Sequence, residues 1–291
     1  MAKQTADVYQ IITDRIVAIL EKGTAPWRKP WAGNGSDPTN LVSKRGYSGI
    51  NYFMLSASEY TSPHWLTYKQ AKDLGGHVRK GEKGTPVIFW KLLDREENGE
   101  PVEGAKKIPF LRYYTVFNLE QCEGVEIPAS LEPKTYAHDP IEAAEAVQLA
   151  MPNRPVVNIV QSGRAFYSPS KDSVTVPELS QYAKPEEYYS TLFHELAHST
   201  GHESRLNREG VTERHHFGSA TYSREELVAE MGAAFLCGHC GIENATLENS
   251  AAYLQGWIKA LKGDKKLAVV AAAQAQKAAN YILNIKHAED E

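Results

Sequence analysis

The HExxH pattern at residues 194–198 constrains this chain more than any other stretch. It lies within residues 185–201, which begin with proline, end with glycine and predict one helix. Histidines four positions apart project from one face of a helix, so their ring nitrogens can meet at one metal ion. The spacing therefore predicts a metal site with His194 and His198 as ligands.

Glu195, next to the first histidine, is the candidate catalytic base. Zn²⁺ lowers the pKa of a bound water to about 7, and a neighbouring carboxylate can then take its proton. Mn²⁺ is an alternative ion. The pattern predicts a zinc metallopeptidase, although the sequence leaves open whether the protein is an enzyme.

A third metal ligand is needed, and the sequence offers two glutamates. The zinc-protease pattern with a third histidine fails, because Ser204 stands where that histidine belongs. A second helix, predicted over residues 223–238, places Glu226 and Glu230 on one face. Glu226 is the predicted ligand, and Glu230 is predicted to orient a ligand histidine. Alternatively, Ser223 and Glu226 form a capping box, and Glu230 becomes the ligand.

Length and charge suggest two parts with different partners. The chain has 291 residues, which allows two domains. Residues 1–93 hold 13 Lys and Arg against 7 Asp and Glu, a balance of +6, whereas residues 131–291 hold 15 against 21, a balance of −6. The basic part favours a polyanion. No apolar run spans a membrane, and three cysteines argue against a disulfide framework, so we expect a cytoplasmic protein with no membrane partner.

Three stretches of the N-terminal part gather aromatic and cationic residues around glycines and prolines. Aromatic rings can stack on bases while Lys and Arg meet phosphates, which is typical of single-strand binding. Alternatively, the aromatic residues belong to the core. The sequence shows no recognition-helix or zinc-finger motif, which disfavours duplex DNA as the ligand. The candidate DNA-binding residues are Trp27, Arg28, Lys29, Trp31, Lys44, Arg45, Tyr47, Asn51, Lys80 and Lys83.

Apolar periodicity predicts the main elements. Residues 6–22 predict an amphipathic helix, and a second helix is expected to open at Trp65 and end at Gly75. Two strands, at residues 86–93 and 110–117, are joined by an exposed hairpin connection. Three short strands within residues 156–176 precede the HExxH helix. Two further helices are expected at residues 251–261 and 264–284.

Together these motifs resemble the ArdC-type antirestriction proteins of conjugative plasmids over nearly the whole chain. In the N-terminal part the resemblance rests on residues 26–31, 45–47, 51, 65–67, 70, 80–84, 116–118 and 121. In the C-terminal part it rests on residues 166–167, 194–202, 205, 217–219 and 225–236. The expected fold is α+β with two domains: a small single-stranded-DNA-binding domain over residues 1–127, a linker over 128–140 and a zincin-like metallopeptidase domain over 141–291.

The resemblance implies an antirestriction protein that binds single-stranded DNA and protects incoming plasmid DNA from host restriction. One alternative is a DNA-dependent metalloprotease, similar to the Spartan-type proteases, that acts on DNA-bound proteins. Another is a protein that docks on host restriction enzymes without binding DNA. Glu195 bears on this choice, because a purely structural metal site does not need it.

Overall fold

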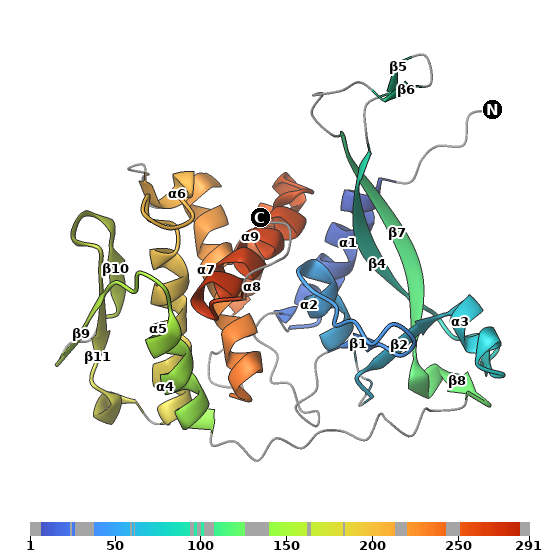
Figure 1. The fold of residues 1–291 in the computed structure, drawn as a ribbon, viewed down its shortest axis with the longest axis horizontal. Helices are drawn as coiled ribbons and strands as arrows, with labels where there is room; N and C mark the ends of the chain where they lie inside the picture. Colours follow the sequence, from blue (N-terminus) through green and yellow to red (C-terminus); the bar gives the residue numbers. More distant parts are fainter. Residues whose placement is uncertain are drawn as a thin grey trace.

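The structure is a computed structural model that describes residues 7–23, 25–26, 38–58, 60, 62–93, 96–97, 100–101, 108–125, 140–161, 164–182, 184–212, 220–242 and 251–285. Its elements form an N-terminal group, from α1 to β8, and a C-terminal group, from α4 to α9 (Figure 1). The fold is α+β, which confirms the expected class. No helix in the described part of the chain is long and apolar enough to cross a membrane.

The N-terminal group is built on a four-stranded sheet in the order β1-β2-β7-β4. β2 and β4 both run antiparallel to β7, and β1 runs parallel to β2. β4 and β7 extend beyond their neighbours as a two-stranded ribbon (Figure 1). The group contains α1 (Val8–Glu21), β1 (Thr39–Asn40), α2 (Ile50–Ser56), β2 (His64–Thr67), α3 (Tyr68–Asp73), β3 (His77–Val78), β4 (Thr85–Leu93), β5 (Glu96–Glu97), β6 (Glu100–Pro101), β7 (Ile108–Asn118) and β8 (Cys122–Glu123).

The expectation that a helix opens at Trp65 is wrong. Trp65 and Leu66 belong to β2, where they are 1% and 0% exposed and pair with β7. The helix α3 begins only after Thr67, whose Oγ1 accepts a hydrogen bond from the backbone N–H of Gln70 at 3.2 Å. The Gln70 side chain in turn accepts from the Thr67 N–H at 2.8 Å, which completes a capping box. Burial in the sheet and this cap set the boundary.

The C-terminal group places helices beside a small sheet. That sheet has the strand order β10-β11-β9, with β11 antiparallel to β10 and parallel to β9. α5 packs against β10 and β11 and also against α7, which packs on α9. The group contains α4 (Pro140–Ala150), β9 (Val156–Val160), β10 (Phe166–Ser168), β11 (Ser173–Pro177), α5 (Pro185–Ser199), α6 (Glu209–Thr212), α7 (Ala220–Cys240), α8 (Ala251–Gly263) and α9 (Leu267–Ile282).

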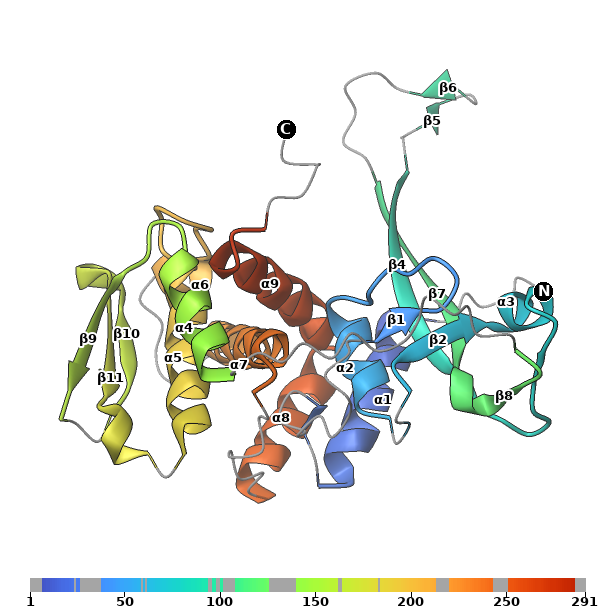
Figure 2. The same cartoon turned by 60° about the horizontal axis from the view of Figure 1, so that its bottom comes forward.

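The two groups share one hydrophobic core. Ile12 and Ile16 of α1 are wholly buried in the same cluster as Leu261 of α8. The ring of Phe53 in α2 lies 4.6 Å from the ring of Phe235 in α7. In Figures 1 and 2, α8 and α9 lie between the N-terminal helices and α5. The predicted linker over 128–140 lies outside the described residues, apart from the first residue of α4.

Candidate metal centre

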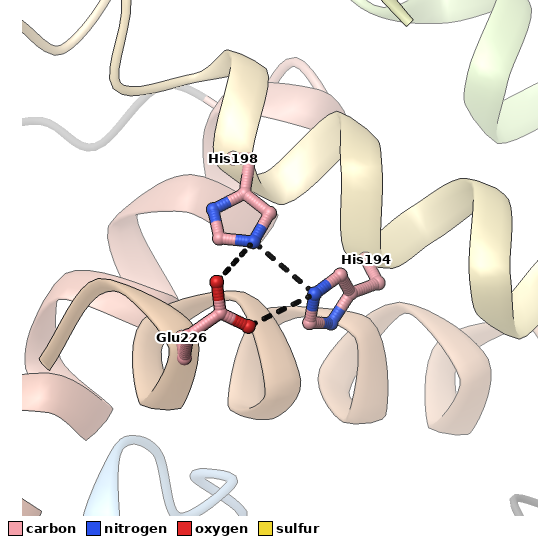
Figure 3. Close-up of side chains that lie close together, drawn as sticks. All are labelled: His194, His198 and Glu226. Carbon is pink, nitrogen blue, oxygen red and sulfur yellow. Dashed lines mark hydrogen bonds and ion pairs between the residues drawn. The ribbon is translucent and has the colours of Figure 1, made fainter. Parts of the chain in front are cut away.

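The helix α5 carries the HExxH residues. It begins at Pro185, whose fixed φ and missing N–H suit the first helical position. The next two residues are glutamates, which the positive end of the helix dipole stabilises. His194 and His198 are half-buried and point toward α7 (Figure 3). The rest of this stretch of α5 is anchored by side chains that are 0% exposed, namely Leu192, Phe193, Leu196 and Ala197.

Glu226, from the second turn of α7, completes a cluster with the two histidines (Figure 3). The two Nε2 atoms lie 3.1 Å apart, and the Glu226 oxygens lie 3.7 Å from Nε2 of His194 and 3.5 Å from Nε2 of His198. An ion held tetrahedrally at about 2.0–2.1 Å separates its ligands by about 3.3 Å. The three side chains therefore fit one divalent ion, and two histidines with one glutamate leave a coordination position open for chemistry.

Several carboxylates give this cluster a negative field. Burial alone lowers the pKa of a histidine, yet the pKa of His194 is raised on balance, because Glu226 hydrogen-bonds to it and Glu195 and Glu230 lie nearby. Glu195 itself is only 8% exposed. Burial raises the pKa of Tyr182, and the charge of Glu195 raises it further. Such a concentration of negative charge favours a bound cation.

Glu225, to which the sequence assigned no role, contacts the other ring nitrogen of His198. Its Oε1 lies 3.4 Å from Nδ1 of His198. Arg208 donates two hydrogen bonds to the same carboxylate, at 3.0 and 2.6 Å. Burial opposes the charged form of Glu225, but the contacts with His198 and Arg208 lower its pKa on balance. A carboxylate at Nδ1 fixes the ring so that Nε2 faces the metal position.

Arg208 also donates hydrogen bonds to the end of α5. Its Nη1 donates to Oγ1 of Thr200 at 2.6 Å, and its Nη2 donates to the carbonyl of Ala197 at 2.8 Å. Gly201 has no room for a side chain, because a Cβ there meets Cγ2 of Val211 at 2.5 Å. The turn after α5 is therefore closely packed, and it brings Arg208 against the C-terminal end of α5.

The orienting role had been predicted for Glu230 rather than Glu225. Glu230 lies near enough to His194 for its charge to raise the pKa of that histidine. Glu225, one residue before Glu226, is turned about 100° around α7 and reaches His198 from the side of Arg208. The capping-box alternative for Glu226 is wrong, because α7 begins at Ala220 and Ser223 lies inside it. The ligand assignment itself stays a prediction.

Arg205 joins the end of α5 to the small sheet. Its side chain is 1% exposed and forms an ion pair with Asp172, just before β11. Its Nε donates to the carbonyl of Ser199 at 2.8 Å, and its Nη2 lies 3.3 Å from the Tyr167 hydroxyl. The histidine-bearing helix is thus tied to the sheet by an arginine with partners on both.

Comparison with known proteins identifies the family. Residues 6–117 match the N-terminal domain of the anti-restriction factor ArdC, and residues 145–275 match the zincin-like metallopeptidases. The metal-free crystal structure of antirestriction protein ArdC from plasmid R388 is 38% identical, with a TM-score of 0.75 over 97% of this chain and 100% of that one. The chain belongs to the ArdC family of antirestriction proteins. An Mn(II)-bound structure of the R388 protein, with the same identity and TM-score, covers 96% of this chain and 98% of that one.

Curated relatives extend the ArdC likeness to longer proteins. Two proteins named DNA primase TraC from Escherichia coli are each 37% identical over 97% and 94% of this chain. This chain spans only 28% and 20% of their lengths. The uncharacterized protein y4eC of Sinorhizobium fredii is 34% identical over 95% of this chain and 91% of its own. The ArdC unit thus occurs both by itself and as a small part of larger proteins.

The structure places the predicted DNA-binding residues of this ArdC-family chain in different settings. Trp27, Arg28, Lys29 and Trp31 lie outside the described residues. Lys44, Arg45, Lys80 and Lys83 are exposed. Tyr47 is half-buried; its hydroxyl accepts a hydrogen bond from Asn40 at 3.3 Å, and its ring packs on the cluster around Trp65.

Asn51 is engaged within the fold. Its Nδ2 donates to the carbonyl of Ile88, and its Oδ1 accepts from the N–H of the same residue, both at 2.7 Å. Because β4 is an edge strand of its sheet, Asn51 can bond to the open edge of β4 as a neighbouring strand would. Both polar atoms of the Asn51 side chain therefore already have partners in the protein.

Proposed function

We propose that this ArdC-family protein binds single-stranded DNA through its N-terminal part and protects incoming plasmid DNA from host restriction, and that its HExxH site hydrolyses peptide bonds. The observation that carries the enzymatic half is the convergence of His194, His198 and Glu226 beside the buried Glu195. We propose Zn²⁺ as the ion, with Mn²⁺ as the alternative. We propose a cytoplasmic location, because incoming plasmid DNA meets host restriction there.

Each residue of the site has its own proposed role in peptide hydrolysis. The two histidines and Glu226 would hold a divalent ion, and that ion would supply Lewis acidity for peptide hydrolysis. Glu195 accepts a proton from the attacking water and delivers it to the leaving amine. Glu225, held by Arg208, keeps His198 in the orientation that binding needs.

The charge of the N-terminal part supports the DNA half of the proposal. Its balance of +6 over residues 1–93 contrasts with −6 over residues 131–291. Four of the candidate cations, at positions 44, 45, 80 and 83, are exposed. Cations that neutralise phosphates release counterions, so binding weakens as salt rises.

Fluorescence anisotropy of a labelled single strand and its duplex, titrated with the full-length protein at several salt concentrations, tests this half. We expect tighter binding to the single strand and a linear fall of log affinity with log salt concentration. If neither DNA binds even at low salt, the DNA half is wrong. The N-terminal part then acts on protein, and the restriction enzymes themselves become the target.

A DNA-dependent protease that acts on DNA-bound proteins is the second candidate function. It is favoured by Glu195, because a metal site that only stabilises the fold needs ligands and no base. The two candidates differ in whether hydrolysis serves DNA protection or is the main activity.

Glu195→Ala tests the peptidase chemistry in either case. Cleavage of a protein substrate in the presence of single-stranded DNA should fall by at least about 100-fold, the lower range for loss of a general base. Metal content and DNA affinity should not change, because Glu195 is not among the three clustered ligands. The exposed Glu203, changed to Ala, is the control. Undiminished cleavage by the Glu195→Ala protein would exclude this mechanism.

A further inference from the structure

The ribbon of β4 and β7 carries exposed aromatic rings that neither the core nor the metal centre uses. Phe89, Tyr114 and Tyr113 are 55%, 48% and 42% exposed. Moving an aromatic side chain out of water is favourable, so three exposed rings on one ribbon indicate a binding surface.

Strand register sorts these rings onto the two faces of the ribbon. Phe89 pairs with Arg112, and Ile88 pairs with Tyr113. Directly opposite residues share a face, and every second residue along a strand returns to that face. Phe89, Arg112 and Tyr114 therefore lie on one face, which we call the ribbon platform, and Tyr113 lies on the other.

The same face is covered at its root and open beyond it. Val87 and Val116 are only 5% and 2% exposed, because they pack with Leu55 of α2 and with Trp65. The ribbon platform begins two residues farther along each strand, at Phe89 and Tyr114. Figures 1 and 2 both show the ribbon extending beyond α2. The exposure thus arises where the cover of α2 ends.

We propose that the ribbon platform stacks the bases of single-stranded DNA, with Phe89 and Tyr114 as the stacking rings and Arg112 beside them to meet a phosphate. This rests on the proposed DNA binding and names the side chains that hold the bases. Aromatic rings with an interleaved cation are the means by which proteins hold single strands without sequence preference.

Spacing and charge favour a single strand as the occupant. Diagonal neighbours such as Phe89 and Tyr114 stand about 7–8 Å apart. That is roughly twice the 3.4 Å rise of a stacked duplex, so successive bases reach both rings only in a stretched strand. No carboxylate belongs to residues 85–89 or 111–118, whose side chains the structure describes.

The charge of the segment between β4 and β7 bears on where the strand would cross. Residues 94–107 hold 5 Asp and Glu against 3 Lys and Arg, a balance of −2, which repels a polyanion. The DNA path therefore crosses the ribbon near its root, over Phe89, Arg112 and Tyr114.

The test measures the affinity of full-length protein for a labelled single strand of mixed sequence by anisotropy. The double variant Phe89→Ala with Tyr114→Ala should bind at least about tenfold more weakly, because stacking contributes about 1–3 kcal/mol per base. Its salt dependence should stay unchanged, since no phosphate contact is lost. Arg112→Ala should instead reduce the salt slope by about 0.7, the value for one phosphate contact on a single strand.

Tyr113→Ala is the matched control, because this ring is similarly exposed but faces the other way. It should leave affinity within about twofold of wild type, well below the loss of one stacked base. The double variant Phe89→Tyr with Tyr114→Phe keeps both rings, so it should bind the single strand with wild-type affinity. This result would show that the double-alanine variant loses affinity through lost stacking and not through a damaged fold.

The outcomes separate this inference from the proposed function. If wild type binds DNA and the double-alanine variant binds equally well, the ribbon platform is wrong and the proposed function stands. If the wild-type protein does not bind DNA, both the ribbon platform and the proposed DNA binding are wrong. If the double variant changes self-association in sedimentation but leaves DNA affinity intact, the rings contact a second copy, and the proposal is overturned.

Discussion

The metal centre and the ribbon platform bring their residues together in different ways. In the metal centre, two histidines lie one helical turn apart, and Glu226 of α7 joins them in a half-buried setting. On the ribbon platform, Phe89 meets Arg112 only through strand pairing, and the side chains face solvent. The spacing of the two histidines in the sequence already predicts part of the metal centre. The ribbon platform exists only in the folded sheet, so the comparison separates sites that a motif reveals from sites that need register.

The largest expected effect lies in the metal centre and distinguishes its two candidate carboxylates. Glu226→Ala should weaken binding of Zn²⁺ or Mn²⁺ by more than about 100-fold, beyond the range for an outer carboxylate. Glu230→Ala should cost less than about tenfold, because the clustered donors at 194, 198 and 226 remain.

Isothermal titration calorimetry on the metal-free proteins gives both affinities. The metal-induced rise in Tm supplies a second reading, because an ion that binds only the folded state stabilises it in proportion to the logarithm of its concentration over Kd. The reverse ranking of the two variants would make Glu230 the ligand. DNA affinity should be equal in both proteins, since neither residue belongs to the N-terminal group.

The second effect concerns the part of the metal centre that no motif revealed. Glu225→Gln keeps the size of the side chain but removes the charge that Arg208 and His198 share. We expect a loss of about 10–100-fold in metal affinity, as for other carboxylates that orient a ligand histidine. The variant also leaves Arg208 buried without its ion pair, so its metal-free form should unfold at lower temperature.

Calorimetry at low temperature, where the variant is folded, separates these two consequences. If Tm falls and metal affinity does not change, Glu225 supports the fold alone. Single-strand affinity measured on the same sample is the control from the other region. It should match wild type if the ribbon platform is independent of the metal centre.

The sequence reveals those parts of the site and fold that depend on local order. The helical period marks α1 and α5, and the apolar runs mark β4 and β7, because neighbours in sequence produce those patterns. Two histidines at i and i+4 are visible for the same reason. Glu225 gains its contact with Arg208 only through a turn packed around Gly201, which no local pattern encodes.

Helix α2 and strand β2 were missed for a related reason. Residues 52–55 of α2 are all buried, since this short helix lies between the sheet and the C-terminal helices, and a continuous apolar run shows no helical period. The local pattern around Trp65 predicts a helix, whereas its pairing with β7 makes it part of β2. Tertiary burial overrode local propensity in both places.

The smallest effect is expected at Asn51, for which the sequence predicts DNA binding and the structure indicates a role in the fold. The sequence placed Asn51 among the candidate DNA-binding residues, and the structure pairs its side chain with both backbone groups of Ile88. Asn51→Ala should lower the free energy of unfolding by about 1–2 kcal/mol, because two hydrogen bonds at the open edge of β4 are lost and water replaces them only in part. Chemical denaturation measures this change.

Anisotropy on the folded variant then decides between the roles. Because Phe89, Arg112 and Tyr114 remain in place, single-strand affinity should stay within about threefold of wild type, less than the loss of one stacked base. A variant with unchanged stability and weakened DNA binding would instead show that Asn51 contacts DNA. In that case the DNA surface would include α2, next to Val87 and Ile88 at the root of the ribbon, and the platform would be only part of it.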